Sequence, residues 1–236
     1  MTDRKVIAID GLAGSGKSTI ARLLSERLGF VHLSTGLIYR SAGYIALQAG
    51  LSLDRPELLV QELLKHKISL QLSGNSAVVS IDEKEMGEEL HTPQVSEATS
   101  KCAQYREIRQ ALYRSQREAF SDKDIIVEGR DMGTIVFPDA ALKIFITASA
   151  EVRVERRMRQ LYGESEAFST EQLAQMRGEM EREIRERDNR DQNRSEAPTV
   201  ASKDSIIIDN SSKGLDPLIS QIVSLAVERG LADKLS

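Results

Sequence analysis

A glycine-rich segment near the start of the chain carries the residue types that bind phosphate. Residues 11–18 read G-L-A-G-S-G-K-S, which fits the pattern G-x-x-x-x-G-K-[ST], and they lie between an apolar run and an apolar helix-forming run. Backbone N–H groups can surround a polyphosphate only where side chains are absent, and the glycines of this segment meet that need. The following helix directs its positive dipole end toward the same place. The stretch therefore predicts a phosphate-binding loop for a nucleoside triphosphate.

The loop and a later apolar run together predict a site for the Mg²⁺ ion that accompanies ATP. Lys17 is expected to reach the β- and γ-phosphates as a catalytic residue, and Ser18 to offer its hydroxyl to the metal. Glu128 follows the apolar residues 125–127, where an acidic residue binds the metal directly or through water. Asp10 is a weaker candidate for that task. The ATP-binding residues expected from the loop are Gly11, Leu12, Ala13, Gly14, Ser15, Gly16, Lys17, Ser18 and Thr19.

A second polar segment, residues 129–134, follows Glu128 directly and reads G-R-D-M-G-T. In an open α/β sheet, the loops outside the carboxyl ends of the strands line the ligand crevice. Arg130 is suited to clamp a phosphate there, and Asp131 to accept a hydrogen bond from an exocyclic amine. The alternative interpretation is a local Arg–Asp pair within a turn.

Arginines are concentrated on two later helical stretches. Residues 150–162 include Arg153 and Arg157, and the spacing of Arg187, Asp191 and Arg194 puts these three on one helix face. Phosphoryl transfer depends mainly on positioning and on charge neutralisation, so arginines suit a lid that closes on the transferring group. The alternative interpretation is a solvated helix held by Glu–Arg pairs.

The elements that must position these residues alternate between strand and helix, which predicts an α/β fold of three layers with a parallel five-stranded sheet. Short apolar runs are typical of strands covered on both faces. A hairpin pattern interrupts this order, because apolar residues alternate on both sides of the turn S-G-N-S at 73–76. It predicts a small inserted antiparallel β subdomain at about 64–95, followed by one long helix over 93–120. The expected parallel strands are residues 5–10, 31–34, 124–128, 142–147 and 205–209.

Composition excludes several other classes. The chain has 236 residues with a net charge of −4, which does not suggest a binder of nucleic acid polymers. Its one cysteine, Cys102, provides neither a disulfide framework nor a cysteine zinc site, and the three histidines lack ligand spacing. No signal peptide pattern and no run of membrane-spanning length occur. We therefore expect a cytoplasmic protein without membrane contact, and a monomer by default.

The quoted motifs, with two others, resemble those of the bacterial cytidylate kinases over nearly the whole chain. The most specific is E-G-R-D-M-G-T-I-V-F-P-D at 128–139, where Glu128 stands at a position that more often holds Asp in the family. The others are I-D-G at 9–11 with the phosphate loop, T-G-L-I-Y-R at 35–40, and E-R-D-N-R-D-Q-N-R at 186–194.

This resemblance implies a single P-loop kinase domain over 1–236, with a monophosphate-binding region at 35–120 and a lid region at about 153–168. It implies transfer of the ATP γ-phosphate to CMP or dCMP, assisted by Mg²⁺. By the same analogy Asn210 and Ser211 lie near the adenine, and Arg153 and Arg157 act as catalytic lid arginines on the ATP phosphates. The implied CMP-binding residues are Thr35, Arg40, Ser100, Arg109, Arg130, Asp131, Arg187, Asp191 and Arg194.

The implied base site is chemically sensible. Cytosine presents an N4 amine beside the acceptors N3 and O2, which a carboxylate (Asp131) and a guanidinium (Arg109) complement, whereas uracil would set O4 against the carboxylate. Two alternatives stay open at this point. One is a kinase for another acceptor such as UMP, and the other is a nucleotide-dependent switch or regulatory module. A GTPase would need an N-K-x-D motif, which the sequence lacks.

Overall fold

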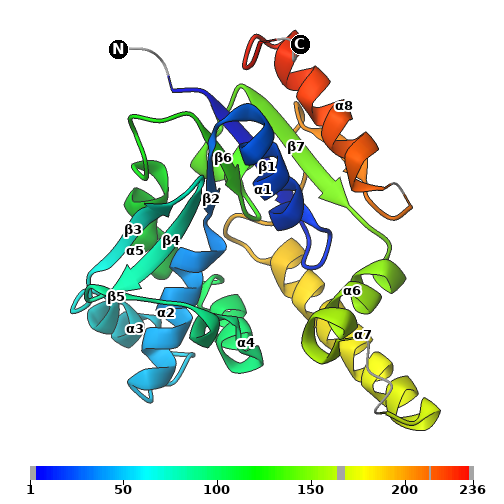
Figure 1. Ribbon diagram of the computed structural model, residues 1–236. Coiled ribbons are helices and arrows are strands. Elements are labelled where there is room, and N and C mark those ends of the chain that lie inside the picture. Colours follow the sequence, from blue (N-terminus) through cyan, green and yellow to red (C-terminus); the bar gives the residue numbers. More distant parts are fainter. Residues whose placement is uncertain (1–3, 164–167, 213, 234–236) are drawn as a thin grey trace.

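The computed structural model of the chain describes residues 4–163, 168–212 and 214–233. Within these residues, one sheet of eight strands runs through the molecule in the order β3-β4-β2-β6-β1-β7-β8, with β5 paired to β4 (Figure 1). The strands are β1 (Val6–Gly11), β2 (Val31–Ser34), β3 (Ile68–Ser73), β4 (Ser76–Ile81), β5 (Lys84–Glu85), β6 (Ile125–Glu128), β7 (Leu142–Thr147) and β8 (Ile206–Asp209).

The five predicted parallel strands are present as β2-β6-β1-β7-β8, and they pair in parallel. The expected sheet of five strands is nevertheless too small. The hairpin β3–β4, expected as an inserted subdomain, extends the same sheet, because β4 lies parallel to β2 with His32 opposite Ser76. The backbone N–H of His32 also donates to the carbonyl of Asn75 at 2.7 Å. This pairing shields an edge of β2 that would otherwise be exposed.

The helical elements are α1 (Lys17–Leu28), α2 (Gly36–Gln48), α3 (Pro56–Leu63), α4 (Pro93–Cys102), α5 (Arg106–Arg117), α6 (Ala150–Tyr162), α7 (Thr170–Asn193) and α8 (Leu215–Glu228), with a 3₁₀ turn η1 (Glu88–His91) and a π turn η2 (Met132–Val136). None of the described helices combines the length and hydropathy needed to cross a bilayer. The α6–α7 hairpin extends away from the sheet (Figure 1). Residues 164–167 of the predicted lid lie outside the described residues.

Alternate residues of β1 point to opposite faces of the sheet and enter different cores. Ile7 and Ile9 pack with apolar residues of α1 and α8 on one face. Val6 and Ala8 pack on the other face with residues of η2 and its flanks, including Phe137. The central strand is therefore buried on both sides, as its continuous apolar run predicts.

The single helix predicted over 93–120 is wrong, because the chain forms α4 and α5 with a turn at residues 103–105. Tyr105 is extended, with φ −88° and ψ 128°. Cys102 and Ile108, on either side of the turn, both enter one apolar core with α2 and β4. Neither glycine nor proline marks this turn. Side chains cap the starts of two helices: the Thr92 hydroxyl accepts from the backbone N–H of Val95 at α4, and Ser169 forms a capping box with Gln172 at α7.

Candidate active site

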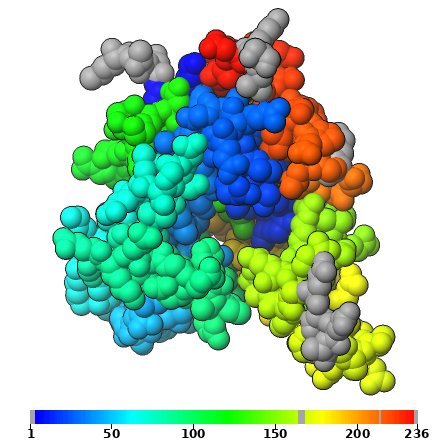
Figure 2. Space-filling view, viewed as in Figure 1, coloured from blue at the N-terminus to red at the C-terminus, as the bar shows by residue number. Residues whose placement is uncertain are grey.

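A cavity of about 650 Å³ opens at the carboxyl ends of β1, β2 and β6. Figure 2 shows it as a hollow between the side of the molecule drawn in light blue to green, which carries α2 and α4, and the lime-coloured α6. The predicted site residues that line it are Ala13, Gly14, Gly16, Lys17, Ser18, Thr19, Thr35, Arg40, Ser100, Arg109, Glu128, Arg130, Asp131, Arg157, Arg187, Asp191 and Arg194. Gly11, Leu12, Ser15 and Arg153 were predicted for the site but are not among the lining residues.

The phosphate loop has the conformation that its glycines predict. Gly14 and Gly16 adopt φ of 74° and 92°, which disfavour any residue with a Cβ. Helix α1 begins at Lys17 without a side-chain cap and without an acidic residue in its first turn. Its first N–H groups are therefore available to an anion, where the helix dipole favours negative charge.

Lys17 lines the cavity beside the phosphate loop. Its Nζ donates to the carbonyl of Leu12 at 3.2 Å, and only 7% of the residue is exposed. Burial, with the neighbouring charge of Arg130, lowers the pKa of Lys17 to about 7. An anion bound in the loop would favour the charged ammonium.

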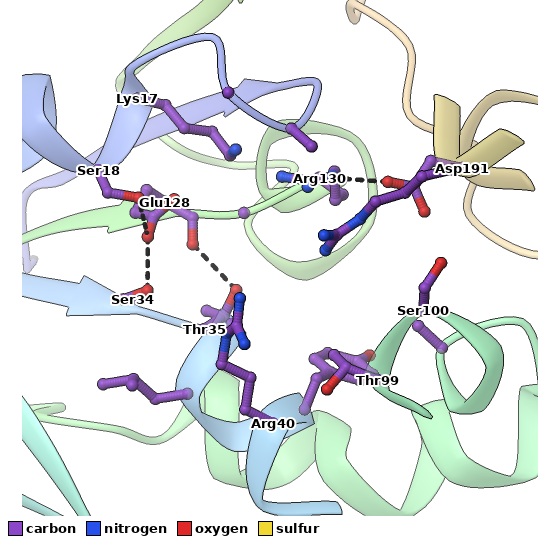
Figure 3. A pocket seen from close by; sticks show the side chains of 18 of the residues that line it. Lys17, Ser18, Ser34, Thr35, Arg40, Thr99, Ser100, Glu128, Arg130 and Asp191 are labelled. Atoms are coloured by element: carbon purple, nitrogen blue, oxygen red, sulfur yellow. Dashed lines mark hydrogen bonds and ion pairs between the residues drawn. The ribbon is translucent and has the colours of Figure 1, made fainter. Parts of the chain in front are cut away.

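Glu128 is held by two hydroxyl groups (Figure 3). Its Oε1 accepts from Ser18 Oγ at 3.0 Å and also from Ser34 Oγ. Burial alone would raise the pKa of Glu128, but the charge of Lys17 and the Ser34 hydroxyl outweigh it and lower the pKa. The carboxylate is therefore ionised beside the Ser18 hydroxyl.

This donor set fits Mg²⁺, which prefers oxygen ligands and usually takes one or two from protein, with water and phosphate completing its shell. No group of three or more His, Cys, Asp or Glu residues suited to a metal exists within the described chain. The weaker metal candidate, Asp10, uses both carboxylate oxygens in hydrogen bonds to the backbone. Its carboxylate accepts from the backbone N–H groups of Met132 at 2.8 Å and Gly133 at 2.7 Å.

Another part of the cavity wall is built around a buried ion pair between Arg109 and Asp131. A second guanidinium lies nearby, with Arg194 Nη2 at 3.7 Å from Asp131 Oδ1. The ring of Tyr39 lies under Arg109, with 5.6 Å between the guanidinium carbon and the ring centroid. The ion pair therefore presents a fixed carboxylate and a fixed guanidinium at a buried wall.

Three further cations converge between the two ends. Arg130 donates through Nε to Asp191 at 2.9 Å and through Nη1 to the carbonyl of Gly11 at 3.1 Å (Figure 3). Burial and the charge of Arg130 lower the pKa of Arg187 to about 10. Arg40 donates to the carbonyl of Leu90, and burial beside Arg157 lowers its pKa to about 10 as well. Such a concentration of positive charge in a cleft favours an anionic ligand.

The remaining predicted residues are placed as follows. Thr35 Oγ1 donates to the Glu128 carbonyl at 2.9 Å. Ser100 faces the cavity from α4 across from Asp191, and its Oγ accepts from Arg190 at 3.3 Å (Figure 3). Arg157 lines the cavity and donates to Gln160 at 2.9 Å. Ser211 Oγ donates to Asp209 and is not among the lining residues.

Comparison with known proteins agrees with this geometry. A family model described as cytidylate kinase matches residues 7–228 of the chain. The chain belongs to the cytidylate kinase family.

Curated cytidylate kinases resemble the chain along nearly all of its length. That of Thermotoga neapolitana is 40% identical over 223 residues, which cover 94% of this chain and 97% of the relative. That of Aeromonas salmonicida is 37% identical over 228 residues, covering 97% and 96%. That of Desulforamulus reducens is 36% identical over 230 residues, covering 98% and 100%. The resemblance read from the motifs is thus confirmed.

In this member of the cytidylate kinase family, several polar side chains of the cavity were not predicted from the motifs. Ser34 and Tyr39 line it, and both were within reach of a prediction, since they adjoin or belong to the T-G-L-I-Y-R motif. Arg190 contacts Ser100 from within the E-R-D-N-R-D motif, but its neighbours gave no reason to single it out. Arg156 also lines the cavity, and its role depends on contacts that no local pattern encodes.

Proposed function

We propose that this chain transfers the γ-phosphate of ATP to CMP or dCMP, forming ADP and CDP or dCDP. The observation that carries the proposal is the joining of two sites in one cavity: the phosphate loop with Lys17 at one end and the Arg109–Asp131 pair at the other. Two phosphorylated ligands that meet between these ends bring donor and acceptor phosphates together, and such positioning is the main task in phosphoryl transfer.

On the donor side, the loop amides and the start of α1 bind the ATP phosphates, and Lys17 neutralises charge on the β- and γ-phosphates. Ser18 would hold Mg²⁺ directly and Glu128 through water, and the metal would neutralise the charge that develops on the phosphate oxygens. Arg157 lines the cavity from α6 and is placed to add a further positive charge on the transferring group. It is the lid arginine of this proposal.

On the acceptor side, Arg40, Arg130 and Arg194 bind the monophosphate together with Thr35, while Arg187 and Asp191 bind near the ribose. The acceptor oxygen belongs to a phosphate that is already anionic, so the transfer needs no separate general base. Arg187 is well suited to this environment, because its buried Nε has no hydrogen-bond partner among the described residues and can donate to a ligand.

The base is selected by Asp131, Arg109 and Ser100. The Asp131 carboxylate accepts from the N4 amine of cytosine, and Arg109 donates to the ring acceptors. UMP is disfavoured, because its O4 would meet the carboxylate as a second acceptor. Because Asp131 is buried and already paired, water cannot readily relieve that mismatch.

The proposal includes the regional division expected from the sequence, with a monophosphate-binding region at 35–120 and a lid at about 153–168. It also includes a cytoplasmic monomer. The experiment that tests the activity is ADP release from ATP–Mg²⁺ with and without added CMP. Steady ADP production that requires CMP supports a kinase. Nucleotide binding without CMP-dependent turnover would favour the alternative, a regulatory ATP-binding module.

A further inference from the structure

Two backbone carbonyls of the phosphate loop are held by side chains that do not belong to the loop. The carbonyl of Ala13 accepts from Arg153 Nη1 at 3.2 Å. The carbonyl of Ser15 accepts from Asn210 Nδ2 at 2.8 Å and from Arg156 Nη1 at 3.2 Å. The two arginines are three residues apart on α6, and Asn210 directly follows β8.

Peptide geometry makes these contacts relevant to the opposite side of the loop. In a trans peptide, the carbonyl and the N–H of the next residue point in opposite directions. No cis peptide bond occurs among the described residues. Holding the carbonyl of Ala13 toward Arg153 therefore directs the Gly14 N–H away from Arg153, and holding the carbonyl of Ser15 toward Asn210 directs the Gly16 N–H away from Asn210. Both glycines line the cavity.

The two glycines also show how closely the support is packed. A Cβ on Gly14 would lie 3.2 Å from Arg153 Cβ and 3.3 Å from the Arg153 carbonyl. A Cβ on Gly16 would lie 2.5 Å from Asn210 Nδ2. A side chain at either position would therefore displace the supporting groups, apart from the strain of its positive φ.

The supporting side chains are themselves held by the protein. Arg153 Nη2 pairs with the buried Asp188 of α7 at 2.7 Å. Arg156 Nη2 donates to the carbonyl of Asn210 at 2.8 Å. Asn210 is 1% exposed. By contrast, Arg157 lines the cavity, and its side chain donates to Gln160 of the same helix and not to the loop.

We propose that Arg153, Arg156 and Asn210 are positioning residues, which fix the carbonyls of Ala13 and Ser15 and thereby preorganise the Gly14 and Gly16 amides as phosphate donors. The proposal rests on the proposed function for the identity of the ligand. It replaces the sequence-based role of Arg153 as a lid arginine on the ATP phosphates. Donors that are already aimed require no reorganisation when the nucleotide binds.

The test compares Arg156→Ala and Asn210→Ala, singly and together, with Arg159→Ala as the matched control. Arg159 is an exposed arginine of the same helix, whose side chain is 61% exposed. Calorimetry would measure the affinity of each protein for ATP, ADP and inorganic tripolyphosphate. Each variant is expected to bind all three probes about tenfold more weakly. That loss corresponds to one hydrogen bond from a loop amide to a charged phosphate. CMP affinity and the control should not change.

Two features separate positioning from direct phosphate contact. Because Arg156 and Asn210 act through the same carbonyl of Ser15, the double variant should lose much less than the product of the single losses. Hydrogen exchange of the Gly14 and Gly16 amides in the unliganded protein should accelerate in both variants, as a direct readout of the loop. Arg156→Lys keeps the charge but cannot reach both carbonyls, so it should restore affinity only in part.

The proposal is overturned if Asn210→Ala is silent while Arg156→Ala weakens ATP but not ADP and Arg156→Lys restores it fully. That pattern would make Arg156 a direct ligand of the γ-phosphate. Binding is measured without turnover, so the result is independent of the acceptor. If the variants show the expected losses of binding but the wild-type protein makes no CDP, the kinase assignment is refuted and the positioning role stands.

Discussion

The backbone N–H of Met132 donates to the carboxylate of Asp10 at 2.8 Å, which ties the end of β1 to the turn that carries Asp131. Gly133 donates to the other carboxylate oxygen. The same turn is tied a second time, because Arg130 donates to the carbonyl of Gly11. The strand that leads into the phosphate loop therefore also holds the segment proposed to recognise the acceptor.

Asp10→Asn should weaken acceptor binding while leaving ATP binding nearly intact. An amide offers one acceptor, and its NH₂ group would oppose the second backbone N–H. We expect the KM for CMP to rise about tenfold, the cost of one unsatisfied buried group. Steady-state kinetics would measure this against Asp139→Asn, because Asp139 is an exposed carboxylate at the end of the 128–139 motif that pairs with Arg117. A KM rise for ATP alone would contradict the account.

Asp131→Ala should relax the preference for CMP over UMP. Removing the carboxylate removes both the acceptor for the N4 amine and the repulsion of uracil O4, which is worth about 1–3 kcal/mol of discrimination. The variant should also unfold at lower temperature, since Arg109 would be left buried without its partner. The deciding quantity is the CMP/UMP ratio of kcat/KM. An unchanged ratio would remove Asp131 from the base site.

Lys17→Met should reduce turnover to background while the fold survives. Methionine approximates the length of the side chain in its buried position but provides no charge for the phosphates. Circular dichroism and thermal unfolding would establish that the protein is folded, and a coupled assay would measure ADP release. Turnover near the wild-type rate in the folded variant would refute the assignment of the loop.

The same variant tests the lowered pKa of Lys17. The pKa is about 7 in the folded protein and 10.5 in the unfolded chain, so between these values the unfolded state holds a proton that the folded state lacks. The free energy of unfolding therefore gains a term that rises with pH across this window, by up to about 1.4 kcal/mol per pH unit. Urea unfolding of wild type and Lys17→Met from pH 7 to 10 would show diverging stabilities. Parallel curves would contradict the lowered pKa.

Arg157→Ala should lower kcat more than it weakens CMP binding. Arg157 lines the cavity but has only Gln160 as a side-chain partner in the described chain, so its charge is available to the transferring phosphate. Arg159→Ala, on the same helix, should leave both quantities unchanged. The comparison is made by measuring kcat and the Kd for CMP in parallel. A loss confined to CMP binding would make Arg157 a ground-state or structural residue.

The parts of the structure that follow local patterns were predictable from the sequence. The phosphate loop is one contiguous segment, so the spacing of its glycines, Lys17 and Ser18 could be recognised without knowing any distant contact. The parallel strands are apolar runs bounded by polar or glycine residues, so they could be predicted without knowing which strands they pair with. The starts of α4 and α7 were likewise marked by Thr92 and Ser169, whose side chains cap the helices.

The parts that depend on distant contacts were not predictable. The pairing of β4 with β2 is set by how the hairpin folds back, not by its alternating pattern. The same limit applies to the arginines of α6. Composition predicts that several of them serve the phosphates. Only the packing of α6 against the loop shows that Arg153 and Arg156 donate to loop carbonyls, whereas Arg157, which also lines the cavity, has no hydrogen bond to the loop among the described residues.

The competition that tests the proposed activity most directly is one reaction with equal amounts of CMP, dCMP, UMP, AMP and GMP and limiting ATP–Mg²⁺ that carries a radiolabel in its γ-phosphate. The labelled diphosphates report the ratios of kcat/KM directly, because the ADP left by the donor carries no label. We expect labelled CDP and dCDP to dominate, and labelled UDP, ADP formed from AMP and GDP to be minor products. A predominance of labelled UDP or of a labelled purine diphosphate would preserve the phosphate loop but contradict the base site built from Ser100, Arg109 and Asp131.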